Sequence, residues 1–445
     1  MSLNEQSMLK RNLAIMWFSN FFIGGSLTMV MPFISLYIES FGTFSEEYVQ
    51  RWAGITFAAT FVTAFLFSPI LGRLGDKYGR KKILIFLGLG MSLSLFLMGM
   101  VTTVWQLLLL RLFMGFFAGS IPVTQAFIST QTPKEMAGKV LGTLQTGNIT
   151  GTLLGPLIGG FLADSIGYAD TFKGTSSIIL ISVLLITMVK EFRVDMKRGK
   201  KANYSRLDVV QLILRNPTLT TVLLISMFIQ IALFSIQPIL ALFVSEIHGP
   251  ENLAFFSGLA FSAAGFGNLM MARKWGELAD KKGYIKILIL LLLAGGILYI
   301  PGMFVQEVWQ LVLIRFGLGI TIGGIIPVRM AFIRQEAPVA IQGEVLGYNQ
   351  SLRFLGNIIG PVLGGVLAGS YGFPSVFLVT SILLLLSGFA LLAVTRRIRY
   401  IPTRMHIKET GGASPSLRFF HIDVVYRLPG RVKCPNTYHL VPSKK

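Results

Sequence analysis

One apolar stretch, LLLLRLFMGFFAG (residues 107–119), contains residues whose types and spacing suit chemistry inside a membrane. Arg111, Gly115 and Gly119 are four residues apart, so they share one face of a helix. A guanidinium among apolar residues is expected to face a bundle interior or a water-filled cavity, where it needs partners. The glycines let a neighbouring helix approach closely. Arg111 is therefore a candidate functional charge, and a structural arginine bonded to backbone carbonyls is the alternative.

A second candidate is GRLGDKYGRKK (72–82), which crowds five basic residues and an aspartate between two apolar stretches. A similar stretch, GELADKKGYIK (276–286), follows 204 residues later. The glycines predict a tight turn, and a carboxylate there can accept charge-assisted bonds that form in one conformation and break in another. We expect a conformational latch made of Gly72, Asp76, Gly79, Arg80, Gly276 and Asp280. The basic residues alone are also explained by membrane topology.

A third candidate is a row of glycines that repeats every fourth residue: Gly147, Gly151, Gly155 and Gly159, with Pro156 between the last two. Such a row packs backbones tightly, and the proline predicts a bend. GTLLGPLIGG (151–160) recurs as GNIIGPVLGG (356–365), which contains Gly360 and Pro361.

Polar side chains also lie inside otherwise apolar stretches, and each is predicted to seek a partner in the protein interior. A helix–helix hydrogen bond and a ligand contact are equally good explanations for any one of them. Arg329, two residues after Pro327, is expected near one mouth of the interior. The candidates for a substrate cavity are Asn20, Gln125, Gln145, Asn148, Gln230, Gln237, Asn349, Gln350 and Arg353.

The elements that carry these residues are long apolar helices. The chain of 445 residues is 53% hydrophobic and only 13% charged, which excludes an ordinary soluble globule. A bilayer core needs about 20 apolar residues per helix. The sequence predicts twelve spans, at 13–38, 52–71, 83–102, 106–129, 140–163, 172–190, 218–244, 253–272, 286–305, 309–333, 344–368 and 374–395.

Charge predicts the orientation of these spans. Lysine and arginine concentrate in alternate loops and the other loops are mostly acidic, so the positive-inside rule predicts cytoplasmic N- and C-termini. Topology and attraction to anionic lipid explain the net charge of +20 without a nucleic-acid partner. One cysteine excludes an intrachain disulfide, and the four histidines form no membrane cluster with acids, so we expect no metal site.

Internal repeats divide the chain into two halves. Trp105, Arg111 and Gly115 recur as Trp309, Arg315 and Gly319 at an offset of 204 residues, which predicts two parallel six-helix repeats with a binding site between them. We expect an all-α membrane protein with an N-terminal bundle (1–190), a basic cytoplasmic linker (191–217), a C-terminal bundle (218–395) and a basic tail (396–445). The tail has eleven Lys/Arg and two acids, typical of a disordered or foreign extension.

The motifs together resemble those of the major facilitator superfamily over residues 10 to 398. GRLGDKYGRKK resembles the signature loop of the superfamily, and 107–119 resembles its fourth-helix motif. GTLLGPLIGG resembles the fifth-helix motif typical of drug:proton antiporters. MPFISLY (31–37) and the second glycine–proline copy are similar to bacterial twelve-helix multidrug efflux proteins. The subgroup exports fluoroquinolones and dyes.

The resemblance implies a secondary transporter in the bacterial cytoplasmic membrane that exports amphipathic drugs by proton-coupled antiport with alternating access. It implies a role in proton coupling for Arg111, and a hinge and leak seal at the glycine–proline helices. Its partners would be small amphipathic substrates, protons and the lipid bilayer, with no cofactor and no catalytic residue, and the protein would be a monomer. One expected feature is missing, because no carboxylate lies deep in a span. Glu39 and Glu246, at outer helix ends, are the candidate proton carriers, or else plain loop acids.

Three alternatives remain. A proton-linked exporter of a metabolite or lipid would use the same scaffold, and Arg329 and Arg353 would then favour an anionic or zwitterionic substrate. A membrane enzyme would need a His/Asp cluster, and the sequence offers none. A receptor would need a large extramembrane domain, for which the 28-residue linker 190–217 is too short.

Overall fold

The computed structural model describes residues 3–132, 136–190, 206–337, 341–399, 406–409 and 420–423. Only the backbone is described for residues 3–6, 68–69, 72–73, 76, 137–139, 206–208, 343, 398–399 and the two strands. The chain forms two compact units, Met1–Ala390 and Leu391–Lys445. In the second unit, strands β1 (His406–Glu409) and β2 (Phe420–Asp423) pair antiparallel, with His406 opposite Asp423.

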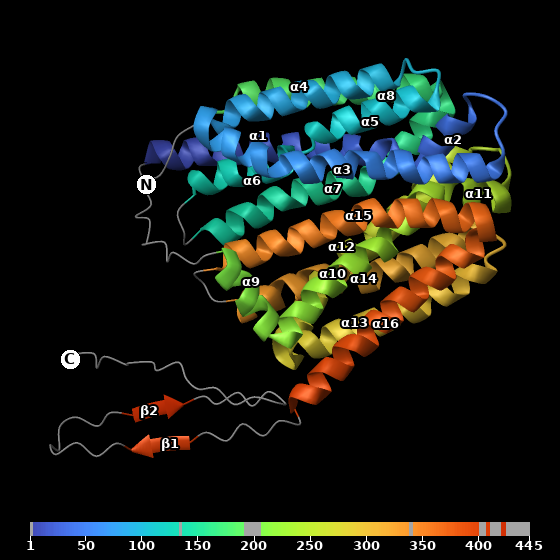
Figure 1. Ribbon diagram of the computed structural model, residues 1–445. Helices are drawn as coiled ribbons and strands as arrows, with labels where there is room; N and C mark the ends of the chain where they lie inside the picture. The colour runs from blue at the N-terminus through green and yellow to red at the C-terminus, as the bar shows by residue number, and fades with distance from the viewer. Residues whose placement is uncertain are drawn as a thin grey trace. The chain divides into compact units, whose positions relative to one another are not determined.

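The first half of unit 1 consists of helices joined by loops over its described residues, and the helices run side by side (Figure 1). Two of the six predicted spans contain more than one helical element, because the helix is interrupted within the span. The elements are α1 (Leu3–Met29), η1 (Met31–Phe33), α2 (Ile34–Glu39), α3 (Glu46–Tyr78), α4 (Arg80–Met98), α5 (Val104–Phe116), α6 (Ser120–Thr130), α7 (Ala137–Ile166) and α8 (Tyr168–Thr187).

The second half repeats this order and begins with a short helix, α9, inside the predicted linker. Residues 191–205 of that linker lie outside the described residues. The elements are α9 (Arg206–Arg215), α10 (Pro217–Ser235), η2 (Gln237–Ile239), α11 (Leu240–His248), α12 (Leu253–Lys282), α13 (Tyr284–Tyr299), η3 (Ile300–Phe304), α14 (Val308–Glu336), α15 (Gln342–Tyr371) and α16 (Phe373–Arg399).

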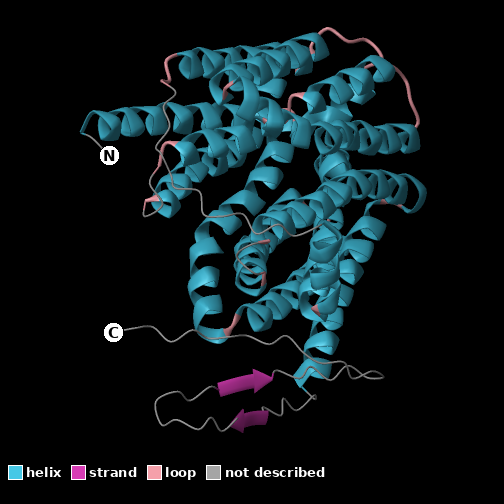
Figure 2. Ribbon diagram, turned by 60° about the vertical axis from the view of Figure 1, so that its left-hand side comes forward, coloured by secondary structure: helices cyan, strands magenta, loops and turns pink. Residues whose placement is uncertain are grey.

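Every predicted span coincides with one helix or one interrupted helix, so the predicted all-α membrane fold is confirmed for the described residues of unit 1. Eleven helical segments among the described residues are long and apolar enough to cross a membrane. The remaining predicted span, 52–71, lies within the 33-residue helix α3. The loops between helices are short (Figure 2).

Two of the interruptions occur at matching places in the two halves. Pro32 is the second residue of η1, which follows α1, and Pro238 is the second residue of η2, which follows α10. Proline lacks an N–H and clashes with the preceding turn, so an α-helix does not pass through these positions undisturbed. The first helix of each half therefore ends in a short, offset segment.

The prediction of a turn over residues 72–82 was wrong in its extent. Helix α3 continues to Tyr78 and α4 begins at Arg80, so only Gly79 leaves the helix, with φ of 95°. Its repeat mate Gly283 has φ of 93°, between α12 and α13. Glycine adopts a positive φ without the steric cost of a Cβ. The two helices extend beyond their apolar spans until one residue separates them. That single residue, with a positive φ, is enough to reverse the direction of the chain.

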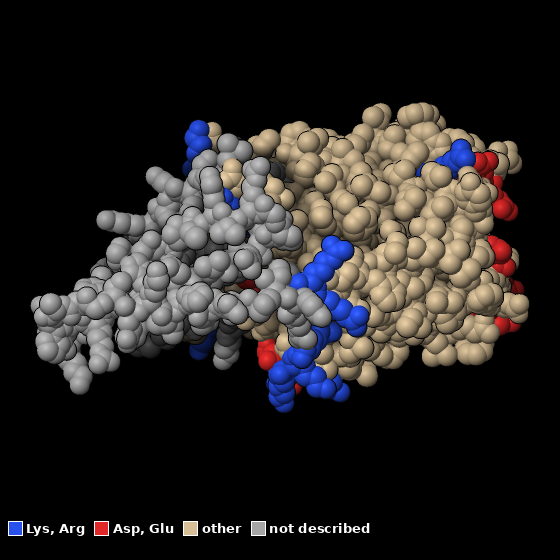
Figure 3. All heavy atoms as spheres, turned by 60° about the horizontal axis from the view of Figure 1, so that its bottom comes forward, with Lys and Arg blue, Asp and Glu red and all other residues tan. Residues whose placement is uncertain are grey.

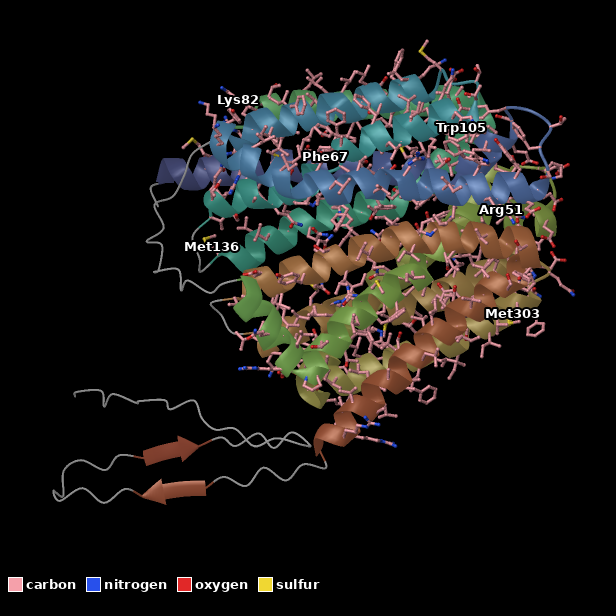
Figure 4. All side chains as sticks on the ribbon, viewed as in Figure 1. Arg51, Phe67, Lys82, Trp105, Met136 and Met303 are labelled. Atoms are coloured by element: carbon pink, nitrogen blue, oxygen red, sulfur yellow. The ribbon has the colours of Figure 1, made fainter. Side chains whose placement is uncertain are left out.

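The helix ends of unit 1 fall into two groups, which we call the acidic end and the basic end. The acidic end holds the connections that follow α2, α4, α7, α11, η3 and α15, with Glu39, Glu46, Asp164, Glu246 and Glu307. The basic end holds the N-terminus and the connections that follow α3, α6, α12 and α14. Acidic side chains gather along one edge in Figure 3. Arg51 lies toward the acidic end, and Lys82 and Met136 toward the basic end (Figure 4).

Candidate functional site between the two halves

The predicted glycine row of α7 packs against α1. A Cβ added at Gly151 would overlap the carbonyl of Phe21, and one at Gly159 would overlap that of Met29. Gly147 and Gly155 face the backbone of Trp17 and Gly25 in the same way. In the second half, Gly356, Gly360 and Gly364 face Met227, Ile231 and Ser235 of α10. The glycines therefore serve backbone-to-backbone packing within each half, and α7 and α15 run on through Pro156 and Pro361 without ending.

Helix α7 also contacts the other half, through a seam with α12. A Cβ at Gly258 would overlap the carbonyl of Pro156, and the Ser262 hydroxyl donates to the carbonyl of Leu153 at 2.8 Å. At the end of this seam, Asp164 accepts from the backbone N–H of Ala254 at 3.1 Å. The α7–α12 seam thus occupies the half of each helix nearest the acidic end.

A matching seam joins α3 and α15. A Cβ at Gly54 would overlap the carbonyl of Pro361, and one at Gly365 would overlap that of Gln50. Arg51 donates to the Ser370 hydroxyl at 3.2 Å. The glycine–proline helix of each half therefore packs on its own bundle with one side and on the opposite bundle with the other.

Neither seam continues in this form to the basic end. Cβ atoms added at Gly142 of α7, Gly276 of α12 or Gly347 of α15 would meet nothing within 4 Å. Beside Gly347, a hollow of about 350 Å³ lies between Phe65 of α3 and residues of α15 that include Glu344 and Phe354. Among the described side chains, the close backbone contacts between the halves thus lie toward the acidic end, and the open glycines and the hollow lie nearer the basic end.

Arg111 and its repeat mate Arg315 are both buried, at 3% and 6% exposed, but differ in their partners. Arg315 Nε donates to the carbonyl of Ala260 at 3.2 Å, and its guanidinium lies 5.7 Å from the ring centre of Phe261. Arg111 Nε and Nη2 are buried without a hydrogen-bond partner. A cation at the centre of a membrane helix costs about 2.5–3.5 kcal/mol on insertion scales. Arg315 offsets part of this cost through local contacts that Arg111 lacks.

The predicted cavity amides separate into two groups. Gln125 donates to Gln145 at 2.8 Å between α6 and α7, and Gln230 donates to Asn357 at 2.7 Å between α10 and α15. These four join helices within one half. The amide groups of the second group retain buried polar atoms without a partner: Asn20 (both atoms), Asn148 Oδ1, Gln237 Oε1 and Asn349 Oδ1.

The two arginines of the C-terminal half lie on two helices, α14 and α15, that contact each other beside them. Arg329 is fully buried in α14, seven residues before this helix ends at Glu336, and its place near one mouth of the interior stays a prediction. Met330, the next residue, accepts a hydrogen bond through Sδ from Asn349 of α15 at 3.5 Å. Arg353 lies one helical turn after Asn349 and donates from Nη1 to Gln350 at 3.1 Å.

The predicted latch is only partly described. The side chain of Asp76 and the surroundings of Gly72 lie outside the described residues. Arg80 donates to the carbonyl of Ala126 in α6, which fixes the start of α4 against that helix. In the second copy, Asp280 accepts from the Tyr284 hydroxyl at 2.6 Å, across the Gly283 break. The latch remains a prediction.

The two predicted proton-carrying acids, Glu39 and Glu246, are exposed at the ends of α2 and α11. The burial that would suit a carboxylate to proton carriage is absent at both positions. Among the described side chains, Asp164 is the acid that bridges the two halves, and sequence reasoning treated it as a loop acid. Its signal was the position directly after the glycine–proline stretch 151–160. Asn357, the partner of Gln230, was also missed, although its spacing of seven residues from Gln350 places both on one helix face.

Two parallel-repeat helical bundles with glycine–proline seams define a multi-pass membrane transporter of the two-half type. The family model described as Major Facilitator Superfamily matches residues 16–304 and 231–425. The chain belongs to this superfamily.

Individual relatives agree with this assignment. The chain is 50% identical over 385 residues to a Bacillus subtilis protein described as "Uncharacterized MFS-type transporter YuxJ", covering 86% of this chain and 98% of that protein. It is 40% identical over 382 residues to multidrug resistance protein MdtG of Dickeya zeae, covering 85% and 93%.

Solved structures with low sequence identity share the fold. An inward-facing bacterial homolog of the human lysosomal transporter Spinster has a TM-score of 0.71 at 15% identity, covering 89% of this chain and 98% of that one. The nucleoside transporter NupG has a TM-score of 0.70 at 13% identity, covering 87% and 99%.

Proposed function

We propose that this transporter exports small amphipathic compounds from a bacterial cell in exchange for protons. The 40% identity to MdtG proteins, which are named for multidrug resistance, supports drug efflux as the direction of transport. The segregation of acidic and basic helix ends supports an orientation with the basic end in the cytoplasm. In this orientation the seams of α7–α12 and α3–α15 close the path to the outside.

The observation that carries this proposal is that the close contacts between the halves, over the described residues, gather toward the acidic end. With the basic end inside, the described conformation opens toward the cytoplasm, where an exporter loads its substrate. Rocking of the halves about the middle of α7 and α15 would separate the two seams. It would bring the open glycines Gly142 and Gly347 against the opposite half, and the substrate would leave on the outer side.

Arg111 is the residue that we assign to proton coupling. Its guanidinium is buried, and two of its nitrogens have no partner. An uncompensated positive charge raises the free energy of any proton bound nearby, by an amount that depends on how much water reaches the site. When the transporter changes the end that is open to water, the amount of water near Arg111 changes, and the proton affinity of neighbouring groups changes with it. Exchange of substrate for protons requires such a change in affinity.

The test uses everted membrane vesicles that contain the chain, acidified inside by respiration and monitored with a pH-sensitive fluorophore. Addition of an amphipathic drug is expected to dissipate part of the proton gradient. The response should be absent in Arg111→Gln vesicles and retained in Arg315→Gln vesicles with equal protein content. No response of wild-type vesicles to a panel that includes a fluoroquinolone and a cationic dye would contradict the proposal.

The alternative is export of a metabolite or lipid by the same cycle. The buried Arg329 and the nearby Arg353 favour it to the extent that they select a negatively charged substrate. Competition in the same vesicles separates the two functions. A cell extract fraction that dissipates the gradient, when drugs do not, would favour the metabolite or lipid exporter.

A further inference from the structure

The C-terminal half carries two cations where the N-terminal half carries neutral side chains. Pro122 and Pro327 align the two repeats at an offset of 205 residues. At the same offset, Arg329 corresponds to Thr124 and Arg353 to Asn148. The Thr124 hydroxyl is bonded within its own helix, to the carbonyl of Ser120 at 2.9 Å. The six-helix scaffold therefore does not need a charged side chain at either of these two positions.

The two arginines have no acidic partner among the described side chains. Arg329 is fully buried, and its Nε, Nη1 and Nη2 have no hydrogen-bond partner. Arg353 Nε is also without a partner, and its Nη1 is held by Gln350. A buried cation such as Arg329 is stable only with a compensating partner, and no described side chain supplies one.

The face of α15 that carries Arg353 is turned toward α10, where Asn357 accepts from Gln230. Gln350, Arg353 and Asn357 follow the i, i+3, i+7 spacing of one helix face. The opposite face holds Leu355, Ile359, Val362 and Val366, which are all exposed on the bundle surface, as lipid-facing residues are. Gln350, which accepts from Arg353, lines the hollow together with Glu344 and with Phe65 of α3.

From this arrangement we infer that Arg329 and Arg353 form a binding site for the anionic group of the transported substrate. The inference rests on the proposed function, because it names the chemical class of the compound that the export cycle carries. The substrate would be an amphipathic anion with a carboxylate, sulfonate or phosphate group. Arg353, which is only half-buried, would meet it first, with Arg329 behind it.

The chemistry of the site fits such a group. A planar guanidinium donates two parallel hydrogen bonds to an oxyanion, and Arg is favoured over Lys for that geometry. The uncommitted Nε atoms of both arginines are available donors. Asn349 lies one helical turn before Arg353, and its Nδ2 contacts the Sδ of Met330, the residue after Arg329. In the first half, the corresponding region offers amides and hydroxyls alone, so charge selection would reside in the C-terminal half.

The experiment measures uptake into everted vesicles of three dansyl compounds that share one fluorophore. Dansyl-glycine is an anion, dansyl-propylamide is neutral and dansyl-ethylenediamine is a cation. Wild-type protein is expected to transport the anion at least tenfold faster than the cation. Arg353→Asn and Arg329→Thr introduce the residues of the repeat mates, so these variants are expected to fold. Each should lower anion uptake at least tenfold and leave neutral uptake within twofold. Arg353→Lys keeps the charge without the planar fork and should lie between.

The outcomes separate this inference from the proposed function. Wild-type vesicles that transport none of the dansyl compounds and show no drug response would contradict the function itself. Wild-type vesicles that transport cation and anion equally, with no change of preference in either arginine variant, would overturn the anion site and leave the function standing. Thermal unfolding in detergent checks that each variant is folded.

A phospholipid headgroup offers the same phosphate chemistry as a soluble substrate. Proteoliposomes with and without anionic lipid distinguish the two sources. If the arginines recognise the substrate, dansyl-glycine transport will depend on Arg353 in purely zwitterionic lipid as well. If the Arg353→Asn variant differs from wild type only when anionic lipid is present, the site holds a lipid phosphate and the inference is overturned.

Discussion

The side chain of Asp164, at the end of α7, accepts a hydrogen bond from the backbone N–H of Phe255 at 2.7 Å, in the first turn of α12. Its other carboxylate oxygen accepts from the N–H of Ala254. A helix N-terminus has unsatisfied N–H groups and a partial positive charge, which together favour an anion. One carboxylate from the N-terminal half thus caps the first long helix after the interrupted α10–α11 segment of the C-terminal half.

Asp164→Asn is expected to weaken the α7–α12 seam. An amide offers one acceptor oxygen and no charge, so one N–H and the helix-dipole interaction are lost, at a cost of about 0.3–1 kcal/mol. Spin labels at positions 166 and 252, in a Cys434→Ser background, would report a larger fraction of molecules separated at the acidic end. Asp170→Asn is the control, because Asp170 pairs with Lys173 in its own helix at 2.8 Å. Equal distance distributions in the wild type and Asp164→Asn would contradict this role.

Gly258→Val is expected to abolish transport while the protein still inserts into the membrane. The added side chain overlaps the carbonyl of Pro156 across the seam, so the halves cannot close at the acidic end. Gly174→Val is the matched control, since a Cβ at Gly174 of α8 would meet nothing within 4 Å. Drug-dependent proton release in vesicles, normalised to protein content, measures the effect. Normal transport by Gly258→Val would show that closure does not need this contact.

Arg315→Gln and Arg111→Gln should fail in different ways. Loss of Arg315 removes the bond to Ala260 and the contact with Phe261, so we expect a lower unfolding temperature with coupling retained. Loss of Arg111 removes a charge with uncommitted nitrogens, so we expect unchanged or higher stability with coupling lost. Unfolding scans and the vesicle assay on both variants test this. The same phenotype in both would contradict the distinction between them.

The Gln230–Asn357 bond is expected to contribute about 0.6 kcal/mol to the stability of the C-terminal bundle, the average for such bonds in membranes. Either residue changed alone to leucine leaves the other amide buried and unpaired, so the single variants should be destabilised more than the double variant. A double-mutant cycle of unfolding free energies measures the coupling. Additive effects of the two changes would mean that the bond does not contribute.

Asp76→Asn is expected to impair transport while the protein level stays near that of wild type. The prediction follows from the sequence, where an acid in a basic segment opposes the topology rule. Asp280→Asn is expected to have a smaller effect, because the Asp280 carboxylate already has a local partner in Tyr284. Export rates of the two variants at equal protein levels provide the comparison, and wild-type export by Asp76→Asn would remove the latch from the mechanism.

The helices were predictable from the sequence because their signals are local. A span needs a sustained apolar length, and a break needs a proline or glycine, as at Pro32, Pro238 and Gly79. The extension of α3 through residues 72–78 was not predicted. Polar residues there were interpreted as a turn, although a helix that projects beyond the bilayer is free to be polar.

The hydrogen-bond partners of individual polar atoms were not predictable in the same way. Gln125 pairs with Gln145 and Gln230 with Asn357, while Asn20 has no partner. These outcomes depend on how far each helix is rotated about its axis. A membrane span is apolar both where it faces lipid and where it faces protein, so its apolar pattern determines that rotation only loosely. The role of Asp164 likewise depends on which helix end of the other half comes to lie beside it.

The backbone contacts at the glycine seams have a consequence for how the protein tolerates sequence change. At Gly151, Gly159, Gly258 and Gly365 the neighbouring carbonyl leaves room for hydrogen alone, so every substitution should be rejected whatever its chemistry. Positions such as Asn148 and Gln237 have uncommitted atoms and should accept many side chains with a change of transported compound. Saturation mutagenesis under drug selection would therefore give a map with two kinds of sensitive position. Substrate range can then vary among descendants of this chain without disturbing the contacts on which movement of the halves depends.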